Sequence, residues 1–150
     1  MSNTITIVEA TKIDFPRIES LLTELLDTVE NSTGIELLKA LENYRVLLKD
    51  ASSHFLVAKI DGFLVGFINF TIRKTILHKG PSALIDELVV SGQHRGQGIG
   101  KHLVSATIER CRELGCCEVE VSTEKVNGKA REFYKNCGFR EDAVLLELHL

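Results

Sequence analysis

The sequence has no excess of positive charge, no signal-like opening and no long hydrophobic run. Its 150 residues contain 18 Lys and Arg against 21 Asp and Glu, which gives a net charge of −3. Because nucleic-acid-binding surfaces require clustered positive charge, this balance argues against DNA or RNA as a partner. No apolar stretch approaches the roughly 20 residues that cross a bilayer, and no basic-then-apolar segment opens the chain. We therefore expect a soluble, cytoplasmic protein that binds no membrane.

The spacing of the cysteines does not fit the common zinc motifs. The four cysteines are Cys111, Cys116, Cys117 and Cys137, and no two of them are separated by two residues. A zinc site is therefore poorly supported, and we expect no bound metal. We expect instead reduced, mostly buried thiols, as in a cytosolic protein.

The hydrophobic pattern that is present predicts one α/β (α+β) domain over residues 1–150. Alternation predicts strands at residues 4–10, 83–90, 117–122 and 143–150, and helical spacing predicts helices at about 15–29 and 36–48, with a break at 30–34. Helices are also expected over 99–114 and 127–137. The Asp61-Gly62 pair lies between two strand-like runs and predicts a tight hairpin. The order is β-α-α-β-β-β-α-β-α-β, with a crossover unit in a mixed sheet.

The segment HRGQGIGKHL, residues 94–103, places three glycines at alternate positions where a helix begins. It matches neither the phosphate-binding P-loop nor the dinucleotide-binding glycine pattern. The physical principle behind both motifs still applies, because a helix N-terminus exposes unpaired N–H groups and the positive end of the helix dipole. With Arg95 and Lys101 at its two ends, the turn is predicted to bind an anionic phosphate.

Two motifs in register resemble the GCN5-related N-acetyltransferase (GNAT) family. RGQGIG, from Arg95 to Gly100, matches the family signature [QR]-x-x-G-x-[GA], and it follows the strand IDELVV. NGKAREFYKNCGF resembles the later element N-x-x-A-x-x-F-Y-x-x-x-G-F. The resemblance implies a mostly antiparallel central sheet with helices on both sides. It also implies acetyl-CoA as co-substrate, and it admits a homodimer, since members of the family are often dimers.

The resemblance implies a role for each matching residue in holding acetyl-CoA. The pyrophosphate would be bound by backbone N–H groups of Arg95, Gly96, Gln97, Gly98, Ile99, Gly100 and Lys101. The pantetheine arm would lie against the preceding strand, which splays from its neighbour in this family, at Leu88, Val89 and Val90. Asn127 would contact the same arm, although asparagine is also a preferred helix N-cap. Tyr134 would lie near the thioester sulfur.

Three residues are candidates for proton transfer. By resemblance, Tyr134 protonates the departing thiolate, whereas a packed aromatic ring is the alternative reading. An attacking amine must be neutral, so a carboxylate, or a water that it orients, must accept a proton. Asp86 and Glu87 are the candidates, and successive strand residues are expected to point to opposite faces. His78, in the loop before the strand, is kept as a reserve base.

The predicted activity is acetyl transfer from acetyl-CoA to a primary amine of a small molecule, by direct attack in a ternary complex. Backbone N–H near Leu88 would stabilise the oxyanion. Two alternatives are an acetyltransferase of protein lysines or N-termini, and a non-catalytic module that senses acyl-CoA. The acidic residues Glu24, Asp27, Glu30 and Glu36 would favour a cationic acceptor, or would simply form a solvated helical face.

Overall fold

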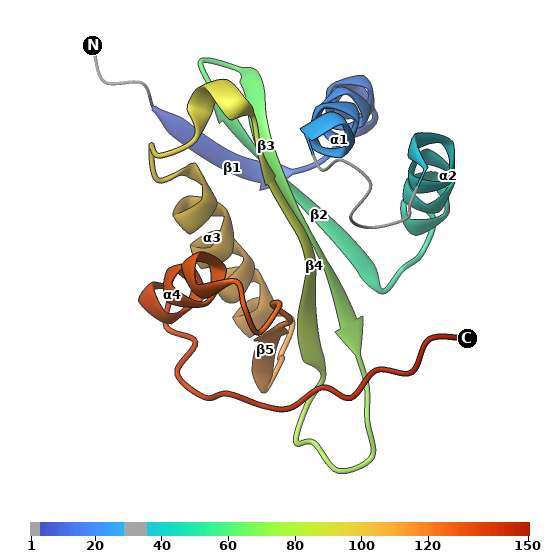
Figure 1. The fold of residues 1–150 in the computed structure, drawn as a ribbon, viewed down its shortest axis with the longest axis vertical. Helices are drawn as coiled ribbons and strands as arrows, with labels where there is room; N and C mark the ends of the chain where they lie inside the picture. The colour runs from blue at the N-terminus through green and yellow to red at the C-terminus, as the bar shows by residue number, and fades with distance from the viewer. Residues whose placement is uncertain (1–3, 29–35) are drawn as a thin grey trace.

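The computed structural model describes residues 4–28 and 36–150, which form one five-stranded sheet between two layers of helices (Figure 1). The strands are β1 (Ile5–Glu9), β2 (Ser53–Ile60), β3 (Phe63–Arg73), β4 (Ser82–Val90) and β5 (Glu118–Val121). The helices are α1 (Phe15–Thr28), α2 (Leu37–Leu47), α3 (Ile99–Glu113) and α4 (Gly128–Asn136), with short 3-10 turns at Lys12–Asp14 and Gly92–His94. The predicted helix break at residues 30–34, with the expected helix end at Val29, lies outside the described residues.

The sheet order follows the chain, and its first four strands are antiparallel. Strands β1 to β4 pair in sequence, whereas β4 and β5 are parallel and are connected through α3. The β2–β3 hairpin turns at Asp61 and Gly62, whose φ angles are 52° and 80°. Both are positive, as the tight turn requires, so the predicted hairpin and the mixed, mostly antiparallel sheet are confirmed.

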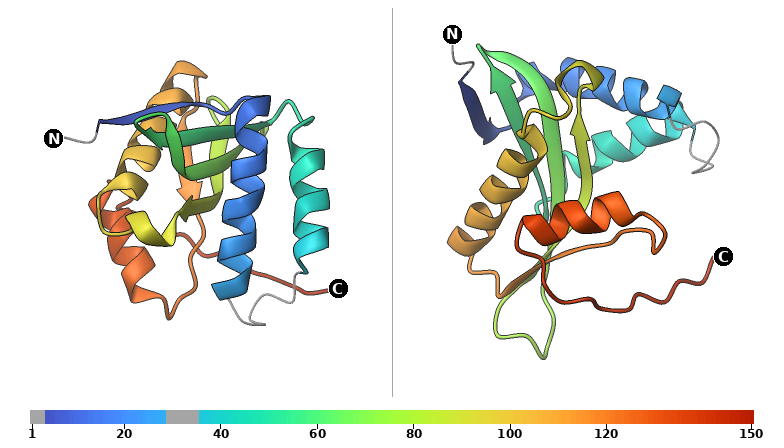
Figure 2. Two further views of the ribbon diagram at one scale, coloured as in Figure 1. Left: turned by 90° about the horizontal axis from the view of Figure 1, so that it is seen from above. Right: turned by 60° about the vertical axis from the view of Figure 1, so that its left-hand side comes forward.

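Each face of the sheet has its own hydrophobic core. On one face, the α3 residues Ile99, Leu103 and Val104 pack with Ile68 and Phe70 of β3. On the other face, α1 and α2 contribute Ile18, Leu21 and Tyr44, which pack with Val57, Phe67 and Val89. Figure 2 shows the same division, with α1 and α2 on one side of the strands and α3 and α4 on the other. The alternation of side chains along a strand therefore decides which layer each one meets.

Strands β4 and β5 pair over only part of the length of β4. The paired positions run from Ser82 with Glu118 to Ile85 with Val121. From Asp86 to Val90, β4 has no partner among the described residues on its β5 side, although it remains paired with β3. The two parallel strands thus separate in the half of β4 that leads into the glycine turn.

The predicted final strand at residues 143–150 is wrong for this chain. This C-terminal tail is exposed, and its backbone makes no hydrogen bond to another described backbone group. It leaves the α4 side, crosses past the sheet and ends on the side of α1 and α2 (Figure 1). A strand needs an alternating sequence and also a neighbouring strand with which its backbone can form hydrogen bonds. The tail has the alternating sequence but no such neighbour among the described residues. The observed order is therefore β-α-α-β-β-β-α-β-α.

Across residues 4–28 and 36–150, no helix combines the length and the apolar character needed to cross a membrane.

Candidate active site

The glycine turn has the backbone conformation that its residues predict. Gly96 and Gly98 have φ angles of 77° and 80°, in the left-handed region. Gly98 is the N-cap of α3, which begins at Ile99. Side chains with a Cβ rarely adopt this conformation, so both positions require glycine for the turn to close.

The N-terminus of α3 has several backbone donors without a partner. No N–H group of residues 95–101 donates to a backbone acceptor among the described residues outside the helix ladder. The first N–H groups of a helix have no partner within the helix. Residues 95–98 are exposed, and so is Lys101. This geometry fits an anionic diphosphate, which would accept several N–H hydrogen bonds beside two cationic side chains.

Gly100 brings three parts of the sequence into contact. A Cβ placed on it would lie 3.3 Å from Cζ of Phe133 in α4 and 3.7 Å from Cδ2 of Leu88 in β4. The glycine signature, the strand before it and the later helix motif therefore meet at one point. A larger residue at this position would push α4 away from β4.

The free edge of β4 offers backbone groups beside this contact. Leu88 packs on the α3 side of the sheet and Val89 is buried on the other side. Val90 O accepts a 3.4 Å hydrogen bond from Nε of Arg95, which ties the strand to the turn. An extended, amide-containing ligand can pair with such an edge as a strand would.

A bulge in β4 places both candidate carboxylates on one face. Asn69 lies opposite Glu87 and Phe70 lies opposite Ile85, so Asp86 is an extra residue in the ladder. Oδ2 of Asp86 accepts a 2.6 Å hydrogen bond from Thr71, which faces the α1–α2 side as Asn69 does. The expectation that the two carboxylates point to opposite faces is wrong, because a bulge shifts the alternation by one residue.

Glu87 carries the perturbed carboxyl of the pair. Its side chain reaches solvent, but the surrounding protein desolvates the charged form and raises its pKa. The neighbouring Asp86 charge raises the pKa further. A carboxyl with a raised pKa is a stronger base than an ordinary exposed one, which suits proton abstraction.

Asn69 is a buried polar residue beside the carboxylates that sequence reasoning missed. It is 1% exposed, and its Nδ2 donates to Ser53 Oγ at 2.9 Å and to His54 O at 3.0 Å. Its Oδ1 is buried and has no partner among the described residues. One feature of the sequence could have indicated Asn69, because it is the single polar side chain in the otherwise apolar run FLVGFINF.

Tyr134 lies on the inner side of α4 with its hydroxyl protonated over a wide pH range. Its ring makes edge-on contacts with Phe133 and Phe139 at centroid distances of 5.0 and 5.6 Å. Burial raises its pKa, and the nearby Cys137 adds to the shift. The helix itself is capped by Asn127, whose side chain accepts from Ala130 N at 3.1 Å. The capping reading of Asn127 is therefore confirmed.

Two of the other residues considered have structural partners. Glu24 of α1 accepts a 2.7 Å hydrogen bond from Gly92 N and so fixes the loop that precedes the glycine turn. His78 lies 3.1 Å from a carboxylate oxygen of Glu118 at the start of β5, and it also contacts Thr75. Those contacts keep His78 beside the first residue of β5, at the end of β4 opposite the glycine turn. Glu30 lies outside the described residues.

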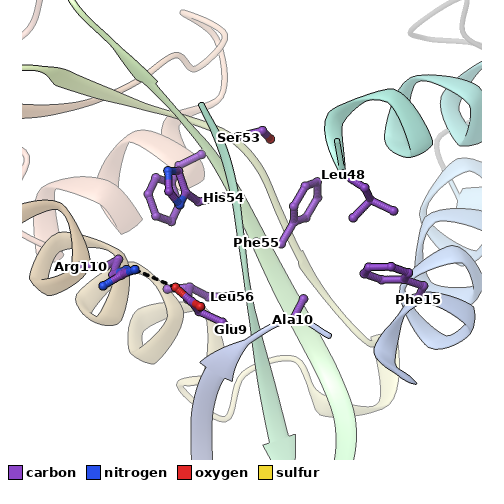
Figure 3. Close-up of a pocket in the computed structure, with 10 residues that line it drawn as sticks. Glu9, Ala10, Phe15, Leu48, Ser53, His54, Phe55, Leu56 and Arg110 are labelled. Atoms are coloured by element: carbon purple, nitrogen blue, oxygen red, sulfur yellow. Dashed lines mark ion pairs between the residues drawn. The ribbon is translucent and has the colours of Figure 1, made fainter. Parts of the chain in front are cut away.

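A separate depression of about 200 Å³ lies at the first residues of β2, where the strand extends beyond its pairing with β1 (Figure 3). Arg110 is ion-paired to Glu9 at 2.9 Å on one side of it, and Phe15 and Phe55 lie on the other. None of the predicted site residues lines it. Among the described residues, no group of three or more His, Cys, Asp or Glu side chains is arranged to hold a metal ion.

Comparison with known proteins places this geometry in a family. The model of the acetyltransferase (GNAT) family matches residues 17–139. An uncharacterised N-acetyltransferase of Methanocaldococcus jannaschii is 33% identical over 103 residues, which cover 68% of this chain and 46% of that protein. The chain thus spans about half the length of that relative.

Two further proteins resemble the chain over most of their length. The aminoalkylphosphonate N-acetyltransferase of Salmonella typhimurium is 29% identical over 132 residues, covering 88% of this chain and 82% of that protein. An aminoglycoside acetyltransferase from an uncultured soil metagenomic sample, solved in complex with sisomicin, superposes with a TM-score of 0.77. It is 26% identical, and the match covers 97% of this chain and 96% of that one.

Proposed function

The chain belongs to the GNAT family of acetyltransferases and is an acetyl-CoA-dependent enzyme, and on this basis we propose that it acetylates the primary amine of a small molecule. The observation that carries the proposal is the contact of Gly100 with Leu88 and Phe133. It brings the glycine turn, the free edge of β4 and the tyrosine-bearing helix together. Acetyl-CoA bound across all three would present its acetyl group beside the carboxylates of Asp86 and Glu87.

Acetyl-CoA supplies the activated acetyl group, and the glycine turn would hold its pyrophosphate. The free N–H groups of residues 95–101 and the positive end of α3 favour a bound anion. The backbone of Leu88, Val89 and Val90 would pair with the amides of the pantetheine arm, and Asn127 would lie near the same arm. Arg95 and Lys101 add charge at the two ends of the turn.

We assign the general base to Glu87 and a supporting role to Asp86. The Asp86 carboxylate is held by Thr71, whereas the Glu87 carboxyl has the raised pKa. Glu87, directly or through a water, would take the proton that the substrate ammonium must lose before it attacks. The two carboxylates on one face would also attract a cationic substrate.

Tyr134 would act as the general acid. Its raised pKa keeps the hydroxyl protonated at neutral pH, so a proton is available for the departing thiolate. Backbone N–H near Leu88 would stabilise the developing oxyanion. Attack occurs directly in a ternary complex, and no cysteine serves as a nucleophile.

The acceptor assignment follows the named relatives. One acetylates aminoalkylphosphonates by its name, and another is an aminoglycoside acetyltransferase. Both names describe small molecules that carry amines, and the paired carboxylates suit the same class.

Thiol release from acetyl-CoA tests the proposal against a panel of aminoalkylphosphonates, aminoglycosides, polyamines, amino acids and lysine or N-terminal peptides. We expect turnover with one class of small amine and a kcat lower by about 10²- to 10⁴-fold in Tyr134→Phe. Turnover on peptides alone would replace the small-molecule acceptor with a protein. Tight binding of acetyl-CoA without turnover on any acceptor would indicate a sensor. Equal rates in both proteins would remove Tyr134 from the mechanism.

A further inference from the structure

The segment of residues 91–98 leads from the end of β4 to α3 and includes Gly96 and Gly98. At its start, the N–H of Ser91 donates to Val65 O of β3 at 2.8 Å, which continues the ladder by one residue. Ser91 is buried, whereas six of the seven residues that follow are exposed. Because packing holds little of this segment, its hydrogen bonds decide where the N–H groups of the turn lie.

A carboxylate of α1 holds the segment immediately after the ladder ends. Oε1 of Glu24 accepts a hydrogen bond from Gly92 N at 2.7 Å, between residues 68 positions apart in the sequence. Among the described residues, no other side chain outside the segment and α3 forms a hydrogen bond with residues 91–98. A hydrogen bond to a charged acceptor is stronger than one between neutral groups, so Glu24 is the main side-chain anchor of the segment.

Gly92 is suited to this contact by its lack of a side chain. A Cβ built on Gly92 would lie 3.0 Å from Oε1 of Glu24. The φ of Gly92 is outside the left-handed region, unlike those of Gly96 and Gly98, so the backbone conformation does not require glycine here. The absence of a Cβ instead provides space for the close approach of the carboxylate.

Helix α1 contacts β4 on the face that carries the two carboxylates. Its residues Ile18 and Leu21 pack in one core with Val89. Glu87 precedes Val89 by two residues and so points to the same face. Helix α1 therefore meets the strand at Val89 and the following segment at Gly92, and it links the carboxylate face to the glycine turn.

We propose that Glu24 is a positioning residue for the donor, an inference that rests on the proposed binding of acetyl-CoA at the glycine turn. By fixing Gly92, Glu24 holds the segment so that the N–H groups of residues 95–101 converge before the diphosphate binds. Less of the interaction energy is then lost in ordering the turn, and binding is tighter. Glu24 acts through Gly92 and not on the donor itself. Because the coupling of two sites is reciprocal, bound CoA in turn stabilises α1.

Isothermal titration calorimetry with CoA measures the effect on donor affinity. In Glu24→Ala, the Kd for CoA should rise by about tenfold, because one hydrogen bond to a charged group is lost. Glu24→Gln keeps an oxygen that can accept from Gly92 N, and it should recover most of that loss. Glu19→Gln is the matched control on the same helix, since it removes only the surface pair with Arg45 at 3.3 Å and should leave the Kd unchanged.

Gly92→Ala tests the same contact from the other side. The added Cβ should push the carboxylate of Glu24 away and raise the Kd for CoA as Glu24→Ala does. In the double variant Glu24→Ala/Gly92→Ala the two effects should not add, because both substitutions remove the same hydrogen bond. Gly92→Ala keeps the sequence of α1 intact, so this measurement does not depend on the folding of Glu24→Ala. Full additivity would overturn the proposal.

Hydrogen exchange of α1 distinguishes positioning from a general loss of stability. CoA should slow amide exchange in residues 18–26 of the wild type, although none of the proposed donor contacts lies on α1. In Glu24→Ala at saturating CoA, this protection should be absent. Protection that is equal in both proteins, or absent in the wild type, would refute the coupling between Glu24 and the donor site.

Gly98→Ala in the same titration separates the role of Glu24 from the donor site itself. Weaker CoA binding in Gly98→Ala, together with an unchanged Kd in Glu24→Ala, would overturn the role of Glu24 and leave the glycine turn as the donor site. No binding of CoA to the wild type, or an unchanged Kd in Gly98→Ala, would overturn both the donor site and its positioning by Glu24.

Discussion

The hydroxyl of Thr71 donates a 2.6 Å hydrogen bond to Oδ2 of Asp86. The bond spans β3 and β4 at the bulge, where Asp86 is the extra residue. This hydrogen bond fixes the carboxylate of Asp86. The pKa of the neighbouring Glu87 is raised, first by desolvation and then by the charge of Asp86. The two neighbouring carboxylates therefore differ: Thr71 holds Asp86 in place, and the surrounding protein and the charge of Asp86 raise the pKa of Glu87.

Glu87→Gln should lower kcat/KM by about 10²- to 10⁴-fold, the usual contribution of a general base. The base acts when deprotonated, so wild-type kcat/KM should fall as the pH drops through the pKa of Glu87. Since desolvation by the surrounding protein and then the charge of Asp86 raise that pKa, the fall should begin at a higher pH than for a fully solvated glutamate. A pH profile of kcat/KM measures both effects.

Asp86→Asn separates the two carboxylates. It removes one of the two causes that raise the pKa of Glu87, so the acid limb of the profile should move to lower pH. An acid limb that stays in place in Asp86→Asn and persists in Glu87→Gln would contradict the assignment of Glu87 as the base.

Gly98→Ala should weaken acetyl-CoA binding and destabilise the fold. A residue with a Cβ at a φ of 80° costs roughly 1–2 kcal/mol, and the turn is the predicted pyrophosphate site. Gly128→Ala in α4 is the matched control, because no atom lies within 4 Å of its added Cβ and its φ is not positive. The control should be neutral or more stable by about 0.5–1 kcal/mol. Titration calorimetry and denaturant unfolding measure the two effects, and equal behaviour of both variants would exclude a special role for Gly98.

The Asp14–Lys59 ion pair should make stability depend on acid pH. Asp14 is 5% exposed, with Lys59 Nζ at 2.8 Å and Thr11 N at 2.9 Å. Burial alone would raise the pKa of Asp14, but the hydrogen bonds and charge of Lys59, with the Thr11 contacts, lower it overall. The pair's stabilisation is thus complete above the unfolded-state pKa of about 3.9, and is lost as the pH falls through the lower native-state pKa.

Asp14→Asn is expected to lower the free energy of unfolding at pH 7 by roughly 1–3 kcal/mol, since it leaves buried donors poorly paired. It should also flatten the dependence on pH below about 4. Glu42→Gln removes the exposed pair with Lys39 at 3.4 Å and should change stability by less than about 1 kcal/mol. Urea unfolding of both variants from pH 2.5 to 7 measures these effects. An equal loss of unfolding free energy in the two variants would argue against a stabilising Asp14–Lys59 pair.

The four thiols should differ widely in reactivity. Cys111 is buried, and burial, followed by the nearby Cys116, raises its pKa to about 12. Cys117 is exposed, while Cys116 and Cys137 are half-buried, so the expectation of mostly buried thiols is wrong. A thiol reagent at pH 7.5 should modify Cys117 first and Cys111 only on unfolding, because the thiolate is the reactive form. Mass spectrometry of partially modified protein gives the order, and early labelling of Cys111 would contradict it.

Local chemistry made several features predictable from the sequence. The Asp61-Gly62 hairpin and the left-handed glycines at 96 and 98 follow from steric limits on φ, which depend on the residues themselves. The apolar periodicity likewise predicted the helices, and the preference of asparagine for helix N-caps predicted Asn127 at the start of α4. Two motifs in register were sufficient to predict the family, which the match over residues 17–139 confirms.

Features that depend on a neighbour were not predictable in this way. The bulge at Asp86 exists only in the pairing of β4 with β3, so the alternation within IDELVV gave the wrong faces. The partners of Asn69 come from β2, and the pKa of Glu87 depends on the protein packed around it.

The C-terminal tail, residues 143–150, shows most clearly which features depend on the local sequence and which depend on a neighbour. Its alternation of apolar and polar residues is a property of residues 143–150 and does not depend on the fold. Whether those residues form a strand depends on an available ladder, and within the described chain the tail does not reach one. The sequence alone therefore determined local conformation, periodicity and family. Only the tertiary structure decided register, pKa and strand partners, because each of these is set by groups that are distant along the chain.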